Sequence, residues 1–206
     1  MAVIPWAAVH FPPQDYAHRE QPMTPFAIRY ATPDDVSILH LMIQEMAQFL
    51  SHEHVVLVTE DDLKEHLFQN RMVDCIIADL QPSGPAIGYS IFYPTFSTFR
   101  GRPGIHVEDI FVRDGFREKN VGRALVHRIT EIATERNACR IQWEAPILNR
   151  RARLFYDSLD VPTITGWVTY RITNAISDMA ESRPGYSKPC PPSTSPSPRP
   201  QKRNKR

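Results

Sequence analysis

A strand, a short polar turn and a helix follow one another from Val107 onward, and this stretch most constrains the fold. The apolar strand Val107–Val112 leads into Arg117–Arg123, which holds three basic side chains and Gly122 around the start of an amphipathic helix. A helix N-terminus presents unpaired N–H groups and the positive end of the helix dipole, and glycine lets backbone approach a ligand closely. The turn predicts either a pyrophosphate-binding site or an ordinary strand-to-helix turn, and taken alone it favours the two about equally.

Better-known phosphate and metal motifs are absent from the chain. It has neither the G-x-x-x-x-G-K-[ST] sequence of a Walker loop nor the three spaced glycines of a dinucleotide fingerprint. Cys75, Cys139 and Cys190 lie far apart without metal-ligand spacing, which predicts no metal site and a reducing intracellular compartment. No apolar run is long enough to span a bilayer, so the sequence predicts a cytoplasmic protein without a membrane partner.

Basic residues gather at the C-terminal end of the sequence. Residues 183–206 hold seven Lys and Arg and no Asp or Glu, which leaves 17 of the 24 basic residues against 23 acidic ones, a formal charge of −6. An acidic body favours cationic ligands and argues against a domain that binds nucleic acid. The final residues, Pro200–Arg206, fit either a nuclear-import patch or a solvated tail.

Composition divides the chain into one folded unit and two tails. Residues 1–24 are predicted to be an irregular extension and the proline-rich residues 183–206 a disordered tail, leaving one domain over 25–182. Within it we expect strands over 26–30, 75–78, 86–93, 105–112, 140–145 and 167–172, and helices from Thr32, Thr59, Val121 and Asn149. Such an order predicts an α/β domain around a mixed, largely antiparallel sheet.

The order of elements, with the basic turn after the fourth strand, resembles the GNAT superfamily of N-acetyltransferases. The superfamily's pyrophosphate motif is R/Q-x-x-G-x-G/A, which Arg117 and Gly122 match, whereas Asn120 replaces the first glycine. Asparagine adopts the left-handed backbone region more readily than most residues, so we expect the turn to survive this replacement. The resemblance implies a sheet of six to seven strands, splayed between the fourth and fifth, with about four flanking helices.

Several segments resemble the spermidine/spermine (diamine) N-acetyltransferase group in particular. They are Phe92–Gly101, Val107–Val112, Gly166–Trp167, and Trp143–Tyr156, which carries that group's W-x-x-x-x-x-N-x-x-A-x-x-F-Y pattern. The resemblance covers residues 26–172. It implies a homodimeric enzyme that transfers the acetyl group of acetyl-CoA to a small primary amine: a polyamine, a diamine or an amino-acid-like amine.

The resemblance also indicates where acetyl-CoA binds. Backbone N–H groups of the fourth strand polarise the thioester carbonyl as an oxyanion hole does, and the basic turn holds the pyrophosphate. Asn149, a predicted helix cap, also hydrogen-bonds the pantetheine arm in the family. The expected cofactor-binding residues are Ile110, Phe111, Val112, Arg117, Glu118, Lys119, Asn120, Val121, Gly122, Arg123, Asn149 and Tyr156.

Three side chains are expected to handle protons and the amine. Tyr156 matches the family's general acid for the leaving thiolate, with a core tyrosine as the alternative. Glu108 matches the group that assists deprotonation of the amine, and Asp109 is expected to help hold the substrate. Strand alternation predicts that these two carboxylates point to opposite faces, so that only one faces the thioester.

The exit of the first predicted helix is where the family places paired acids that hold the distal ammonium of the substrate. This chain has only Glu53 there, beside His52 and His54, and histidine is a poorer partner for an ammonium. The expected function is therefore acetyl transfer from acetyl-CoA to a small primary amine. The alternatives are a protein or histone N-acetyltransferase and a catalytically inactive acyl-CoA-binding module.

Overall fold

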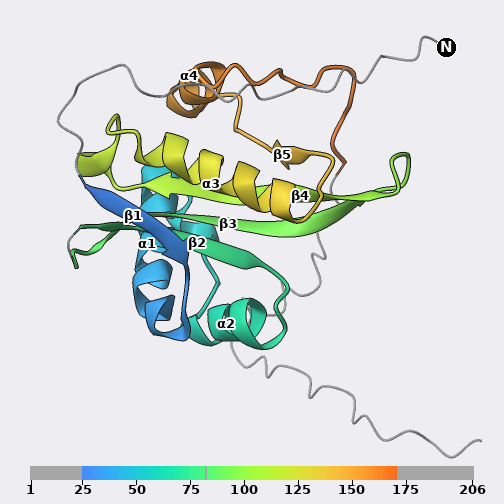
Figure 1. Ribbon diagram of the computed structural model, residues 1–206. Coiled ribbons are helices and arrows are strands. Elements are labelled where there is room, and N and C mark those ends of the chain that lie inside the picture. The colour runs from blue at the N-terminus through green and yellow to red at the C-terminus, as the bar shows by residue number, and fades with distance from the viewer. Residues whose placement is uncertain (1–24, 82, 171–206) are drawn as a thin grey trace, which may run out of the picture. The chain divides into compact units, whose positions relative to one another are not determined.

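The computed structural model describes residues 25–81 and 83–170, and the tails predicted at 1–24 and 183–206 lie outside them. In the described residues a five-stranded sheet is flanked by four α-helices (Figure 1). The strands are β1 (Phe26–Tyr30), β2 (Asp74–Leu80), β3 (Ala86–Ser97), β4 (Arg102–Val112) and β5 (Ile141–Trp143). The helices are α1 (Val36–Leu50), α2 (Glu60–Lys64), α3 (Val121–Glu135) and α4 (Arg150–Asp157).

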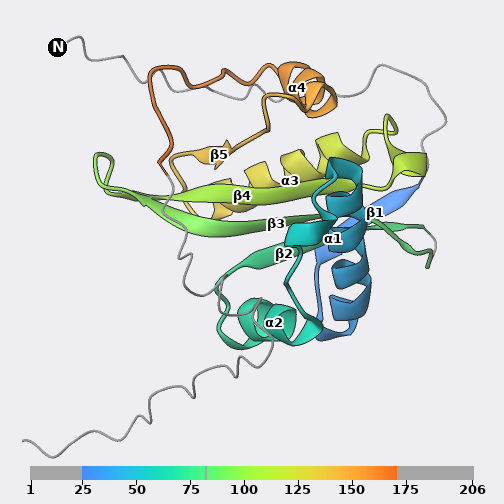
Figure 2. The same ribbon diagram turned by 180° about the vertical axis from the view of Figure 1, so that it is seen from behind.

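The strands are arranged in chain order across the sheet. β1 to β4 are mutually antiparallel and β5 runs parallel to β4. α1 and α2 cover one face and α3 covers the other, as the opposite views of Figures 1 and 2 show. An α1-side core, which includes Ile77 and Tyr89, and an α3-side core, which includes Ile105 and Leu125, therefore lie on opposite faces of the sheet. Burial of these apolar side chains is the main favourable term that holds the layers together.

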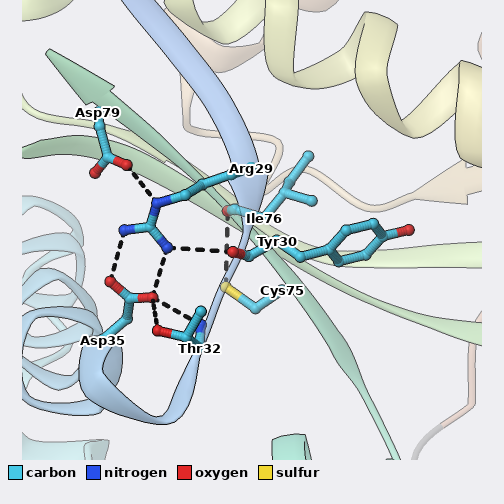
Figure 3. A network of polar contacts seen from close by, with 7 residues as sticks. All are labelled: Arg29, Tyr30, Thr32, Asp35, Cys75, Ile76 and Asp79. Carbon is cyan, nitrogen blue, oxygen red and sulfur yellow. Dashed lines mark hydrogen bonds and ion pairs between the residues drawn. The ribbon is translucent and has the colours of Figure 1, made fainter. Parts of the chain in front are cut away.

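A polar network ties β1 to the start of α1 and to β2 (Figure 3). Arg29 forms a bidentate ion pair with Asp35 at 2.6 and 2.7 Å, and its Nε donates to Asp79 at 2.7 Å. The Asp35 carboxylate also accepts from the Thr32 N–H and hydroxyl at 2.7 and 2.8 Å, which confirms the helix start predicted at Thr32. The hydrogen bonds that Arg29 donates to Asp35 lower the pKa of this carboxyl group to about 2, and those from Thr32 act in the same direction against the effect of burial.

The predicted count of six to seven strands is wrong for the described residues. The sixth strand was expected over 167–172, but residues 167–170 form no strand, and 171–172 lie outside the described part of the chain. The chain divides into a unit that ends at Val161 and a second that starts at Pro162; in the latter, residues 162–170 form no helix or strand. The aromatic and β-branched residues at 167–170 carry strand propensity, but a strand forms only where another strand pairs with it. In the described residues, no helix is both long enough and apolar enough to cross a membrane.

Candidate active site

The splay between β4 and β5 opens a cleft in the first unit. The two strands pair only from Ile105 to Val107 on β4 and from Ile141 to Trp143 on β5. Beyond that point β4 continues to Val112 without pairing to β5, and a cleft of about 580 Å³ lies there. Its walls come from β4, the turn before α3, α4 and the end of α1. The splay predicted between the fourth and fifth strands is confirmed.

Backbone amides of β4 face this cleft in alternation. The Arg113 N–H donates to Ile87 O on β3 at 3.0 Å, and Asp109 O accepts from the Ser90 hydroxyl of β3 at 2.7 Å. Successive backbone groups along a strand point to opposite sides, so the peptide groups of Phe111 also point to β3, and those of Ile110 and Val112 point into the splay. The amides of Ile110, Phe111 and Val112 were all expected at the thioester. Strand geometry directs only those of Ile110 and Val112 toward the cleft.

A β-bulge at Glu108 changes which way the acidic side chains point. Ile91 pairs with Asp109 and the next residue of β3 pairs with Val107, so Glu108 is an extra residue in β4. Val107 belongs to the α3-side core, but Phe111 belongs to the α1-side core, which shows that the alternation reverses at the bulge.

Glu108 and Asp109 consequently lie toward the same face of the sheet. Glu108 approaches His106 with an Oε2–Nε2 distance of 3.9 Å, and His106 stacks on Tyr93 on the α1 side. Asp109 accepts from the hydroxyl of Tyr89, which belongs to the α1-side core, at 3.4 Å. The expectation that alternation separates these two carboxylates is therefore wrong, and both line the cleft.

Asp109 is the more enclosed carboxylate of the pair. Burial raises its pKa to about 6, and the neighbouring charge of Glu108 acts in the same direction, while the hydrogen bond from Tyr89 opposes the shift. The side chain of Glu108 is 59% exposed and sits at the outer end of the cleft. A carboxylate whose pKa lies near neutrality is suited to accept a proton.

Tyr156 lines the opposite wall, on α4. Its ring packs against Trp143 of β5 and Phe155, with ring centroids 5.3 and 5.2 Å apart. Burial raises the pKa of its hydroxyl to about 12, and the charge of Asp109 contributes, so the group is protonated at neutral pH and can donate. Asn149 caps α4, because its side-chain oxygen accepts from the Ala152 N–H at 3.0 Å, as predicted.

The turn before α3 has the predicted left-handed backbone. Asn120 has φ 64°, which confirms that asparagine can replace the family's glycine there, and Glu118 has φ 63°. The first hydrogen bond of the helix runs from Ala124 N–H to Asn120 O at 2.9 Å. The amides of Val121 to Arg123 therefore precede the first intrahelical donor and have no acceptor within the helix, and the helix dipole is positive at this end.

The side chains of this turn are largely engaged with the protein. Arg117 donates from Nε to Val112 O at 2.8 Å, and its guanidinium lies 4.1 Å from the centroid of the Phe49 ring. Arg123 hydrogen-bonds Ser158 at 3.1 Å. Five predicted members of the cradle line the cleft, namely Arg117, Glu118, Asn120, Gly122 and Arg123, whereas Lys119 and Val121 are not among its lining residues. Backbone amides therefore provide much of what the turn offers to an anion.

The structure does not bring Glu53 to this cleft. Glu53 begins a short helical turn after α1 and lines a separate, smaller hollow with Gln44 and Glu45. Two residues of the site were missed in the sequence: Glu144, which follows β5 and lines the cleft, and the buried Tyr89, which hydrogen-bonds Asp109 from the core. A tyrosine within an otherwise apolar strand was the available signal for Tyr89.

Comparisons with known proteins identify the family. The model of the GNAT acetyltransferase family matches residues 40–160. A thialysine N-epsilon-acetyltransferase of Caenorhabditis elegans is 32% identical over 156 residues, which are 74% of this chain and 95% of that protein. An L-ornithine N5-acetyltransferase of Arabidopsis thaliana is 24% identical over 190 residues, covering 71% of this chain and 83% of that protein.

Two further matches bear on the predicted subgroup and on the fold. The spermidine/spermine N(1)-acetyltransferase-like protein 1 of Homo sapiens is 25% identical over 172 residues, which are 79% of this chain and 25% of that protein. The solved structure of a ribosomal-protein-alanine N-acetyltransferase from Brucella melitensis has the same fold, with a TM-score of 0.60 and 23% identity over 72% of this chain and 99% of that one. The chain belongs to the GNAT family and is an acetyl-transferring enzyme, as its sequence predicted.

Proposed function

We propose that the enzyme transfers the acetyl group of acetyl-CoA to a primary amine of a small molecule by direct attack of the amine. The cleft between β4 and β5 carries this proposal, because two kinds of site meet there. Free strand amides and a helix N-terminus offer binding to a thioester and a pyrophosphate, and two carboxylates lie beside a protonated tyrosine.

The residues of the cleft suit acetyl-CoA. The amides of Val121 to Arg123 would hold the pyrophosphate, because they have no acceptor within the helix and the turn that carries them lines the cleft. The amides of Ile110 and Val112 would bind the thioester oxygen, where negative charge grows as the amine attacks. Acetyl-CoA supplies the activated acyl group; the protein supplies orientation and proton transfer.

Asp109 and Tyr156 form the proposed proton path. Asp109 is enclosed and has a pKa of about 6, so it accepts the proton that the attacking amine must lose. As the C–N bond forms and the C–S bond breaks, Tyr156 donates its proton to the departing sulfur. The more exposed Glu108 binds the incoming ammonium. This assignment exchanges the roles that the sequence indicated for the two carboxylates.

The charge of the cleft and the names of the relatives support a small cationic substrate. Glu108, Asp109 and Glu144 gather at one end of the cleft, which attracts an ammonium group. The relatives from nematode and plant are named for thialysine and ornithine, each of which carries a terminal side-chain amine at the position given in the name.

A thiol-release assay tests the function. Purified protein with acetyl-CoA and a panel of ornithine, lysine, putrescine, spermidine and a short peptide should release coenzyme A only when a small amine is present. Coenzyme A binding, followed as a rise in Tm, should accompany turnover. Binding without turnover on any amine would instead indicate an inactive acyl-CoA-binding protein, and a preference for the peptide would indicate a protein acetyltransferase.

A further inference from the structure

Arg140 and Thr95 meet above a glycine beyond the acidic end of the cleft. Thr95 of β3 lies opposite Gly104 of β4, and the Ile105 N–H donates to Arg140 O at 2.9 Å, just before β5. A Cβ atom added to Gly104 would stand 2.7 Å from Thr95 Oγ1 and 3.3 Å from Arg140 Nε. The two polar side chains therefore share the space that the missing side chain leaves.

Neither of these polar atoms has a partner within the described part of the chain. Arg140 Nε and Thr95 Oγ1 are both buried, and both lack a hydrogen bond there. Other arginines are held by acids, as in the pairs of Arg113 with Glu45 at 2.8 Å and of Arg136 with Asp74 at 2.6 Å. Buried donors are normally satisfied, so two unsatisfied ones at the same place indicate an acceptor that binds from outside. A guanidinium has only donors, which makes an oxyanion the matching ligand.

Arg140 and Thr95 lie on the same face of the sheet as the proposed amine site, at a distance that can be derived from the strand register. The stacked rings of Tyr93 and His106 lie between Arg140 and Glu108 on the same face of the sheet. Glu108 lies four residues after Gly104, but the bulge adds one residue without lengthening the strand. The separation is therefore three residues of regular strand, about 10 Å at the usual rise per residue. The face thus has acids at one end, two aromatic rings in the middle and a cation at the other.

We propose that Arg140 and Thr95 bind the carboxylate of an α-amino acid whose terminal side-chain amine is acetylated beside Asp109. The inference rests on the proposed function and names its substrate class. In extended ornithine about five bonds of roughly 1.5 Å separate the terminal nitrogen from the carboxyl carbon, a span of about 6 Å. With a hydrogen bond of about 2.9 Å at each end, such a molecule bridges the acidic and basic ends of the face.

Arg140 also explains how a diamine is discriminated against. Putrescine and ornithine present the same terminal amine to Asp109, but the far end of putrescine is only an ammonium, whereas that of ornithine carries a carboxylate beside its α-ammonium. Arg140 attracts the carboxylate and repels a second ammonium, so a single side chain acts on both substrates in opposite directions. The cationic far ends of longer polyamines meet the same repulsion.

Steady-state kinetics with ornithine and putrescine test this inference. Arg140→Gln should raise KM for ornithine tenfold or more, the usual effect of losing a charge-assisted hydrogen bond, and leave KM for putrescine unchanged or lower. Arg140→Glu should reverse the preference, and Arg140→Lys should restore ornithine binding in part, because it keeps the charge without the planar fork. Arg128→Gln on α3, which removes an arginine paired with Glu131 and Glu135, is the matched control and should change neither KM.

The outcomes separate this inference from the proposed function. Equal changes in KM for the two substrates, or a wild-type enzyme that prefers putrescine to ornithine, would overturn the role of Arg140. A wild-type protein that acetylates neither amine would overturn the proposed function itself. Wild-type kinetics with lysine and its decarboxylated counterpart cadaverine give a comparison that needs no variant: lysine should have the higher kcat/KM.

Discussion

The ring of Phe155 lies over Gly122, so that a Cβ atom added at Gly122 would stand 3.2 Å from Phe155 Cζ. This contact joins the turn that starts α3 to α4, which carries Tyr156 beside Phe155. A side chain at position 122 would therefore push against Phe155 and could shift the proposed acid next to it.

Substitution of Gly122 tests the cofactor site. Coenzyme A in hundredfold excess over its Kd should raise Tm of the wild-type protein by roughly 5–10 °C. Gly122→Glu places a bulky carboxylate between this turn and Phe155, both of which line the cleft, and should abolish that rise. Gly115→Ala is the control, because a Cβ atom there meets nothing within 4 Å, and it should keep the full rise. A full rise with Gly122→Glu would remove this turn from the binding site.

Tyr156→Phe tests the proposed acid, because it removes only the hydroxyl and keeps the ring against Trp143. We expect kcat to fall about 10²-fold, the usual scale for the loss of a general acid, with little change in the affinity for acetyl-CoA. Tyr30→Phe, at an exposed tyrosine of β1, should leave kcat unchanged. Should turnover of Tyr156→Phe match the wild type across the pH range, the tyrosine is a packing residue.

The sequence contained enough to predict most of the fold and to indicate the segments that line the candidate site. The alternating and helical patterns marked five of the strands and the four helices, and the left-handed tendency of asparagine marked Asn120 correctly. Both are local properties, which depend on residues near in sequence. The bulge at Glu108 was not predictable, because the extra residue is defined only by the pairing of β4 with β3, which local sequence does not encode.

Arg140 shows a second limit of the sequence. Nothing around it forms a motif, and its significance comes from Thr95 and Gly104, which belong to other strands. Glu53 is the converse case, since its place after the first helix suggested the amine site but the chain carries it to a different hollow. Residues from distant segments converge through tertiary packing, which local patterns do not encode.

The network around Asp35 gives a prediction about stability. The lowered pKa of Asp35 means that its carboxylate stabilises the folded state above its unfolded pKa of about 4, and that this contribution is lost as pH falls toward 2. Asp35→Ala leaves Arg29 and the Thr32 N–H without this partner, so we expect a loss of about 2 kcal/mol at pH 7 that shrinks in acid. Urea unfolding at several pH values measures this loss of stability, and Asp34→Ala, at a neighbouring exposed acid, is the control. A loss that is the same at pH 3 and pH 7 would contradict the ion-pair origin.

Asp109 should show the opposite dependence on pH, and Asp109→Asn tests both its catalytic and its energetic role. The folded-state pKa of about 6 lies above the unfolded value, so the contribution of this carboxyl group to stability is full below pH 4 and is lost as pH rises through 6. The Asp109→Asn variant has no ionisable group at position 109. Its free energy of unfolding relative to that of the wild type should therefore increase between pH 4 and pH 7, by at most about 3 kcal/mol.

The same substitution should slow catalysis, since the wild-type kcat/KM should rise through pH 6 as the carboxyl group ionises and the variant should lack that step. Asp157→Asn, at an exposed acid at the end of α4, controls for the change of side-chain type and should alter neither profile. Urea unfolding and pH–rate profiles of the three proteins supply both readouts. A variant with the wild-type pH–rate step would transfer the role of base to Glu108, whereas a variant less stable than the wild type at pH 7 would show that the buried charge is compensated within the folded protein.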